Sequence, residues 1–184
     1  MNPIFAAALD LQAFCRREGW RFCLIGAVAV QRWGEPRLTN DVDLTLLTGF
    51  GHEERFVDKL LDTYAGRRPD ARVFALRYRV LLLEGASSVP LDVALGAMPF
   101  EERAVARASD LDIGGGNTLL TCSAEDLVVF KAFAGRDKDW LDIEGVVGRQ
   151  AGRLDVALIF SELEPLLELK GAPEATARLR SILK

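Results

Sequence analysis

The hydrophobic pattern of the N-terminal part of the chain alternates between helical and strand-like spacing. Residues 3–18 place apolar side chains on one side of a helix, with a proline suited to its first turn and a glycine suited to its end. Short apolar runs at 22–25 and 42–47 are typical of buried strands, and a short helical segment begins after Gly26 between them. This region is therefore predicted to form a helix, a strand, a glycine turn, a helix, a loop and a strand.

The middle of the chain mixes helical and strand patterns. Residues 52–64 alternate acids and bases around an apolar stripe, which indicates an amphipathic surface helix. Three strand-like runs follow and predict a β-meander, at 72–75, 78–84 and 89–94. The next segment predicts a short helix at 99–108 and a hairpin with a glycine-rich turn at 109–121.

From Ser123 onward the pattern is helical throughout. Ser123 and Asp126 have the spacing of a helix N-cap, and four helices are expected, at 123–134, 138–149, 154–170 and 173–182. The fold class is therefore predicted to be α/β (α+β). A mixed sheet flanked by helices is expected in residues 1–121, followed by a small helical lobe, residues 122–184, that packs on this core.

Composition narrows the class of protein. A chain of 184 residues with 49% apolar content supports one domain, or one core with a modest appendage. The formal net charge of −4 argues against a surface that coats nucleic acid, although it leaves room for a local basic groove. Cys15, Cys23 and Cys122 lie far apart in apolar surroundings, which favours reduced core thiols. No apolar stretch reaches the ~18 residues that span a bilayer, so a soluble, cytoplasmic protein that does not enter the membrane is expected.

Two acidic residues, Asp41 and Asp43, open the second strand-like run. Residues two apart project from the same face of a strand, so the two carboxylates raise each other's pKa unless a cation neutralises them. Oxygen ligands alone suit Mg²⁺ or Mn²⁺ better than zinc. Gly26 precedes a helix whose first N–H groups can bind an anion, and its missing side chain lets a phosphate approach the backbone. The pattern favours a phosphate site beside a metal site, and the alternative is a solvated acidic turn.

One further acid, Asp92, interrupts the apolar run at 89–94. An unpaired carboxylate would be costly to bury in such a strand. A partner for Asp92 is therefore expected.

These features resemble the nucleotidyltransferase superfamily, which is marked by a glycine turn, a helix and Asp-x-Asp at the start of the next strand. The residues here are Gly26-Ala27 and Asp41-Val42-Asp43. The stretch Arg37-Leu38-Thr39-Asn40-Asp41 resembles the R-x-T-x-D-x-D form of AbiEii/AbiGii-type toxin nucleotidyltransferases and related bacterial families. Many superfamily members have Gly-Gly or Gly-Ser at the turn, so backbone N–H groups would have to hold the phosphates in this chain.

The resemblance implies a role for each matching residue. It implies a catalytic, metal-binding set of Asp41, Asp43 and Asp92, and a nucleotide-binding set of Gly26, Ala27, Arg37, Thr39 and Lys131. Lys131 enters through a second stretch, residues 131–142, which resembles the K-x-x-A-x-R-x-K-D-x-x-D segment of the same families. An ion-pair network at a helix start is an equally good interpretation of the other charged residues in this stretch, Arg136, Lys138, Asp139 and Asp142.

The implied activity is transfer of a nucleoside monophosphate from a nucleoside triphosphate to an acceptor hydroxyl, with release of pyrophosphate and with Mg²⁺ or Mn²⁺ as cofactor. By the same resemblance, the acceptor is the end of a tRNA and the protein is a toxin with a cognate antitoxin as partner. Two alternatives remain open. The acceptor is a small molecule or a protein side chain in one, and in the other the chain binds nucleotide or RNA without catalysis.

Overall fold

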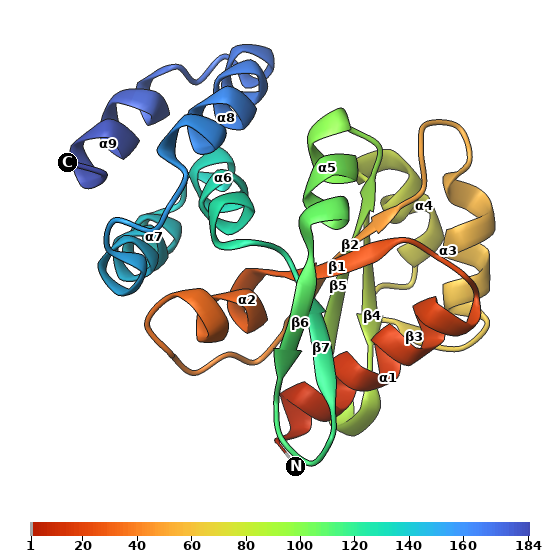
Figure 1. Ribbon diagram of the computed structural model, residues 1–184. Coiled ribbons are helices and arrows are strands. Elements are labelled where there is room, and N and C mark those ends of the chain that lie inside the picture. Colours follow the sequence, from red (N-terminus) through yellow and green to blue (C-terminus); the bar gives the residue numbers. More distant parts are fainter. Residues whose placement is uncertain (1) are drawn as a thin grey trace. The chain divides into compact units, whose positions relative to one another are not determined.

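The computed structural model describes residues 2–184, which form one seven-stranded mixed sheet and a set of helices (Figure 1). The strands lie in the order β3-β4-β5-β2-β1-β7-β6. β2 pairs parallel with β5 and antiparallel with β1, and β1 pairs parallel with β7. The strand bounds are β1 Phe22–Ile25, β2 Val42–Leu47, β3 Ala65–Gly66, β4 Val80–Glu84, β5 Pro90–Gly96, β6 Ser109–Asp112 and β7 Thr118–Thr121.

The chain divides into two compact units. The first contains the chain up to Val28 together with Leu38–Cys122, and it holds the whole sheet. The second contains Ala29–Arg37 and Ser123–Lys184. The short segment before the acidic residues thus groups with the helices of the C-terminal half.

One face of the sheet carries the apolar core of the first unit. In β2, Leu44 and Leu46 are fully buried, and they cluster with Leu81 of β4, Leu91 of β5 and Leu11 of the N-terminal helix. Because side chains alternate along a strand, this arrangement leaves Asp43 on the opposite face. The helices of this unit are α1 Pro3–Arg17, α3 Glu53–Leu61, α4 Ala71–Tyr78 and α5 Pro99–Arg107, with a 3-10 turn η1 at Ala86–Ser88.

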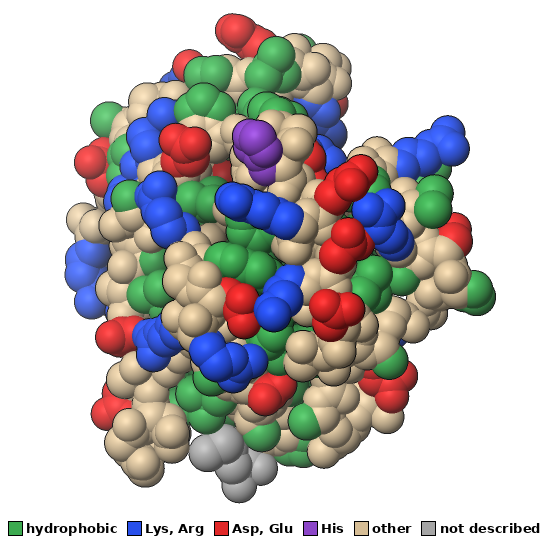
Figure 2. All heavy atoms as spheres, turned by 90° about the vertical axis from the view of Figure 1, so that its right-hand side faces the viewer, with side chains coloured by type: hydrophobic (Ala, Val, Ile, Leu, Met, Phe, Trp, Pro, Cys, Tyr) green, Lys and Arg blue, Asp and Glu red, His purple; other side chains and the backbone are tan. Residues whose placement is uncertain are grey.

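The surface of the first unit over α3 and α4 mixes positive and negative side chains (Figure 2). Arg72 of α4 donates to Asp58 and Glu54 of α3, and Arg68 donates to Asp70. These arginines are therefore already neutralised by neighbouring carboxylates.

The second unit is helical. Its helices are α6 Ala124–Ala134, α7 Asp137–Gln150, α8 Val156–Lys170 and α9 Glu174–Ile182, and α2, Gly26–Trp33, leads into the unit from the first one. Ser123 caps α6 by accepting from the Asp126 N–H at 3.0 Å, and Gly135 ends the helix with φ +72°. Gln150 of α7 donates to the Trp33 carbonyl at 2.9 Å, which ties the 29–37 segment to this unit.

Most elements follow the sequence-based prediction, and the α/β fold class with its mixed sheet is confirmed. The predicted strand at 72–75 is wrong, because these residues belong to helix α4. Ala71 and Ala75, four residues apart, bury one side of that helix, and Phe74 packs on Tyr78 with ring centroids 4.7 Å apart. A four-residue window is too short to separate the period of a strand from that of a helix.

All three cysteines are buried as thiols, as predicted. Burial is the main cause that raises the pKa of Cys15 to about 12, so this thiol stays protonated at neutral pH. None of the helices formed by residues 2–184 has the length and apolar character needed to cross a membrane.

Candidate active site

Gly26 makes the sharp turn between β1 and α2. Its φ is +59°, a left-handed conformation in which residues with a side chain are strained. The preceding residue, Ile25, is the register partner of Asp43 on the antiparallel strand β2. A Cβ atom added at Gly26 would lie 1.9 Å from Oδ2 of Asp43, well inside van der Waals contact. Only glycine therefore lets the start of α2 lie directly against this carboxylate.

Asp43 and Asp92 lie side by side in the middle of the sheet. They are register partners on the parallel strands β2 and β5, which places their backbones about 4.8 Å apart with both side chains on the same face. Asp41 lies just before β2, and its negative charge contributes to raising the pKa of Asp92. Thr39 donates from Oγ1 to Oδ1 of Asp41 at 2.8 Å, so Thr39 holds this carboxylate in place. The structure thus brings the three predicted acids to one region of the first unit.

Arg67 is the partner of Asp92. It follows the short strand β3, and its guanidinium donates to Oδ1 of Asp92. Burial raises the pKa of Asp92 above its ordinary value, the Arg67 charge acts to lower it, and the Asp41 charge acts to raise it. A carboxylate with a raised pKa is a better proton acceptor than an ordinary aspartate. Arg67 was not predicted, because the contact joins residues 25 positions apart and depends on strand order.

The donor chemistry of the acids suits a hard divalent cation. Asp43 and Asp92 offer adjacent carboxylate oxygens on rigid strands, which is the kind of ligand that Mg²⁺ and Mn²⁺ prefer. Within residues 2–184, however, no group of three or more His, Cys, Asp or Glu side chains is arranged to hold a metal ion. Asp43 and Asp92 therefore suit a cation, but the three acids Asp41, Asp43 and Asp92 do not surround a single position for a metal ion.

Ala27 shares the start of α2 with Gly26 and is buried. Its backbone N–H belongs to the first turn of the helix, where N–H groups have no partner within the helix. The predicted phosphate-binding role of both residues stays a prediction.

Arg37 and Lys131 lie in the second unit, in an ion-pair network around two acids of α7. Lys131 is 6% exposed, and its Nζ lies 2.7 Å from Asp142 Oδ2 and 3.1 Å from Asp139 Oδ1. Arg37 binds the same Asp142 through two N–H groups at 2.8 and 3.0 Å, and Arg136 binds Asp139.

Burial acts to raise the pKa of both acids in this network. The hydrogen bonds from Arg37 and Lys131 to Asp142, and from Arg136 and Lys131 to Asp139, outweigh it and hold both pKa values below the usual range. The network interpretation of this stretch thus applies to Arg136, Asp139 and Asp142, and it also includes Lys131. A nucleotide-binding role for Arg37 and Lys131 stays a prediction.

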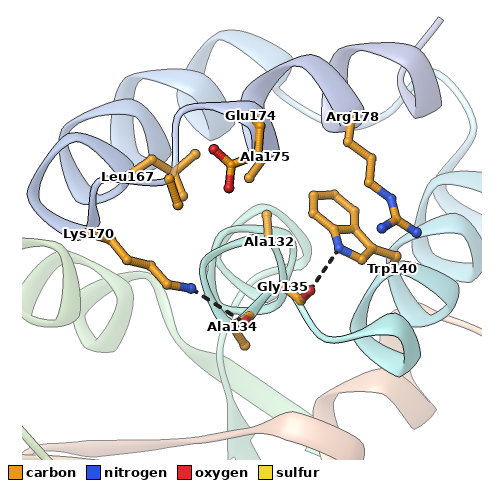
Figure 3. Close-up of a pocket in the computed structure, with 10 residues that line it drawn as sticks. Ala132, Ala134, Gly135, Trp140, Leu167, Lys170, Glu174, Ala175 and Arg178 are labelled. Carbon is orange, nitrogen blue, oxygen red and sulfur yellow. Dashed lines mark hydrogen bonds between the residues drawn. The ribbon is translucent and has the colours of Figure 1, made fainter.

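A separate cavity of about 290 Å³ lies within the helical unit (Figure 3). Trp140 and Lys170 are among the side chains that line it, and Arg178 lies over the Trp140 ring at 4.5 Å. Lys170 donates to carbonyl oxygens at the C-terminal end of α6, and Trp140 Nε1 donates to the Gly135 carbonyl at 3.1 Å. The cavity brings together residues from separate helices, so no local sequence pattern indicates it.

Comparisons with known proteins identify the fold. No protein-family model and no curated protein matches this chain. An antigenic nucleotidyltransferase-like protein from Paracoccidioides brasiliensis superposes with a TM-score of 0.58 at 15% identity, over 97% of this chain and 93% of that one. The chain thus has a nucleotidyltransferase-like fold.

Two further solved structures have TM-scores just below 0.5. The lincomycin-bound lincosamide antibiotic adenylyltransferase LnuA matches at 0.49 and 14% identity, over 74% of this chain and 92% of that one. The antibiotic-resistance factor ANT(2'')-Ia matches at 0.48 and 16% identity, over 97% and 95% of the two chains. The narrower resemblance to AbiEii/AbiGii-type toxins stays a prediction.

Proposed function

We propose that this protein is a metal-dependent nucleotidyltransferase, which transfers a nucleoside monophosphate from a nucleoside triphosphate to an acceptor hydroxyl and releases pyrophosphate. One observation carries the proposal. Asp43 and Asp92 are register partners in the centre of the sheet, and the glycine turn at Gly26 brings the start of α2 against Asp43. The nucleotidyltransferase-like fold supports the same reaction class.

The proposed reaction assigns a task to each acid. Asp41 and Asp43 would hold the divalent cations, which would neutralise charge at the phosphates, and Asp92 would ligate one of these cations. The acceptor oxygen attacks the α-phosphorus as the bond from that phosphorus to the pyrophosphate oxygen breaks. The proton of the acceptor hydroxyl passes to the Asp92 carboxylate as the new bond forms. Backbone N–H groups of Gly26 and Ala27 bind the phosphates at the start of α2.

The predicted nucleotide-binding role of Arg37 and Lys131 competes with the ion pairs that these residues form within the second unit. Both are bound to Asp142, and Lys131 is also bound to Asp139. Lys131 and both of its acids are buried, and breaking a buried ion pair is costly, so the network favours a structural role for Lys131.

The proposal has two versions, which differ in the identity of the acceptor. In the first, which rests on the sequence resemblance, the acceptor is a tRNA end and the protein is a toxin with an antitoxin partner. In the second, the acceptor is a small molecule or a protein side chain. The net charge of −4 favours the second version, and so do the ion pairs of Arg68 and Arg72, because these two arginines are already bound to carboxylates and are not free to bind an RNA backbone.

The test is a transfer assay with radiolabelled nucleoside triphosphates, Mn²⁺, purified protein and total RNA. Label in RNA supports the tRNA version, and label in small molecules or protein supports the second. Asp43→Asn serves as the control, since it keeps the side-chain size and removes the charge. Absence of transfer to every acceptor, together with nucleotide binding, would instead support a non-catalytic relative that binds nucleotide or RNA.

A further inference from the structure

Arg67 approaches from the edge of the sheet and binds Asp92, one of the acids of the proposed metal site. Its backbone N–H donates to the Leu82 carbonyl at 3.0 Å, and Leu82 is the register partner of Asp92 on the next strand. Arg67 therefore lies beside β4 at the level of Asp92. Its side chain reaches the Asp92 carboxylate on β5, which is the strand beyond β4. Arg67 and Asp92 keep 31% and 32% of their side-chain surface exposed, so ions from solvent can reach the pair.

The next residue, Arg68, shows what an ordinary surface arginine does in the same loop. It pairs with Asp70, two residues away, and its guanidinium lies 4.4 Å from the Phe74 ring centroid. Arg67 instead binds an acid from a distant part of the sequence, which sits beside Asp43 in the sheet. The loop thus places one arginine on the surface and one at the acids.

The negative charges of Asp41, Asp43 and Asp92 favour binding of a cation beside these carboxylates. Asp43 and Asp92 are neighbouring carboxylates, and the charge of Asp41 also acts on Asp92, so positive charge stabilises the ionised acids. Arg67 supplies one positive charge, and arginine keeps its charge at any ordinary pH. A divalent cation that binds Asp92 needs the same carboxylate oxygens, so the two cations compete.

We propose that Arg67 is the resident counterion of this carboxylate site, which holds Asp92 while the site is free of metal and gives it up when a divalent cation binds. The inference rests on the proposed function, since it takes Asp92 as a metal ligand. Two consequences follow. Arg67 lowers the affinity for free divalent cations, and it stabilises the metal-free protein.

The experiment is a calorimetric titration with Mn²⁺ alone, without nucleotide and at fixed ionic strength. Arg67→Gln should bind Mn²⁺ about fivefold more tightly than the wild type, the factor that corresponds to about 1 kcal/mol for a partly exposed ion pair. Arg68→Gln is the matched control and should leave the affinity unchanged, although it removes the same charge from the same loop. In an Asp92→Asn background, Arg67→Gln should give no such gain.

A thermal measurement provides a second readout. Metal-free Arg67→Gln should melt at a lower temperature than the wild type, and saturating Mn²⁺ should reduce the difference, because the metal then neutralises Asp92 in both proteins. The Arg68→Gln control should show no metal-dependent difference.

The outcomes separate this inference from the proposed function. If Asp92→Asn weakens Mn²⁺ binding while Arg67→Gln leaves it unchanged or weaker, Asp92 is a metal ligand and Arg67 is not its competitor. If Asp92→Asn leaves Mn²⁺ affinity unchanged, the inference is overturned because Asp92 is no ligand. Nucleotide transfer is measured independently, with the radiolabel, so loss of the inference leaves the transfer proposal to its own test.

Discussion

Replacing Gly26 by alanine tests whether the turn after β1 exists to hold the backbone against Asp43. Two separable costs are expected. Alanine at φ +59° is strained by about 1–2 kcal/mol, the cost of the left-handed conformation. In addition, the new Cβ atom would lie 1.9 Å from Asp43 Oδ2, about 1.5 Å short of ordinary contact at 3.4 Å, and overpacking of this kind costs about 1–3 kcal/mol. Gly26→Ala should therefore destabilise the first unit by about 2–5 kcal/mol.

Gly19→Ala provides the matched control. Gly19 lies in the same unit and has a similar φ of +69°, but a Cβ atom there meets nothing within 4 Å. It should cost only the conformational strain, about 1–2 kcal/mol. The difference between the two variants isolates the contact with Asp43.

Differential scanning calorimetry on both variants and the wild type measures the two costs. A double variant, Gly26→Ala with Asp43→Gly, removes the atoms that the new Cβ would meet, so the two substitutions should be less than additive. Equal destabilisation by Gly26→Ala and Gly19→Ala would refute the reasoning, because the close approach of Gly26 to Asp43 would then carry no energy. Transfer activity should fall in Gly26→Ala even in the folded fraction, because relief of the overlap displaces Asp43.

Three further substitutions and one titration test the assigned roles. Asp43→Asn should keep its circular dichroism spectrum and lose nucleotide transfer, and full activity with unchanged metal dependence would contradict a metal-binding role. Asp92→Ala should also lose transfer. Its free energy of unfolding should change by less than about 1 kcal/mol, because the ion pair of Asp92 with Arg67 is partly exposed. A large drop in melting temperature with activity retained would instead show that Asp92 serves stability. Lys131→Met should destabilise the helical unit by about 3 kcal/mol. This value is at the low end for a broken buried ion pair, because Asp139 and Asp142 each keep an arginine partner. An unchanged melting temperature would exclude a structural role for Lys131. The pKa values of Asp139 and Asp142 are lowered in the folded state, so their contribution is complete above the unfolded aspartate pKa of about 3.9 and is lost as the pH falls through the lower folded values. Acid unfolding of the wild type should be steeper there than that of Lys131→Met, and identical acid profiles would show that Lys131 adds no pH-dependent stability.

Several elements could be predicted because their signals are local. The runs that became β1 and β2 are apolar and are separated by a glycine and a loop, and Gly26 adopts the positive φ that its position indicates. Ser123 and Gly135 mark the two ends of α6 through cap interactions within a few residues. Such features depend on short stretches of chain, which a single sequence displays.

Other features depend on contacts between distant residues. Strand β3 has two residues and exists only because it pairs with β4, so its sequence carries no strand pattern. The pattern around Asp92 predicted a partner, but the identity of Arg67 follows from the order and register of β3, β4 and β5. Likewise, Arg37 joins Asp142 across 105 positions, which places residues 29–37 with the helical unit. No local pattern contains this information.

The acids and their counterion are anchored in parts of the sheet that differ in how easily they open. β2 and β5 are interior strands with a neighbour on each side, whereas β3 is a two-residue edge strand with a neighbour on one side only. Amide protons of interior strands exchange with solvent only when much of the sheet opens, while edge segments exchange through small local fluctuations. We therefore expect slow amide exchange in the backbone that carries Asp43 and Asp92, and faster exchange in the segment that ends in Arg67. Replacement of Arg67 by a metal ion, as proposed above, requires movement of the edge segment alone. The Asp43 and Asp92 carboxylates can therefore keep their spacing while the cation beside them changes.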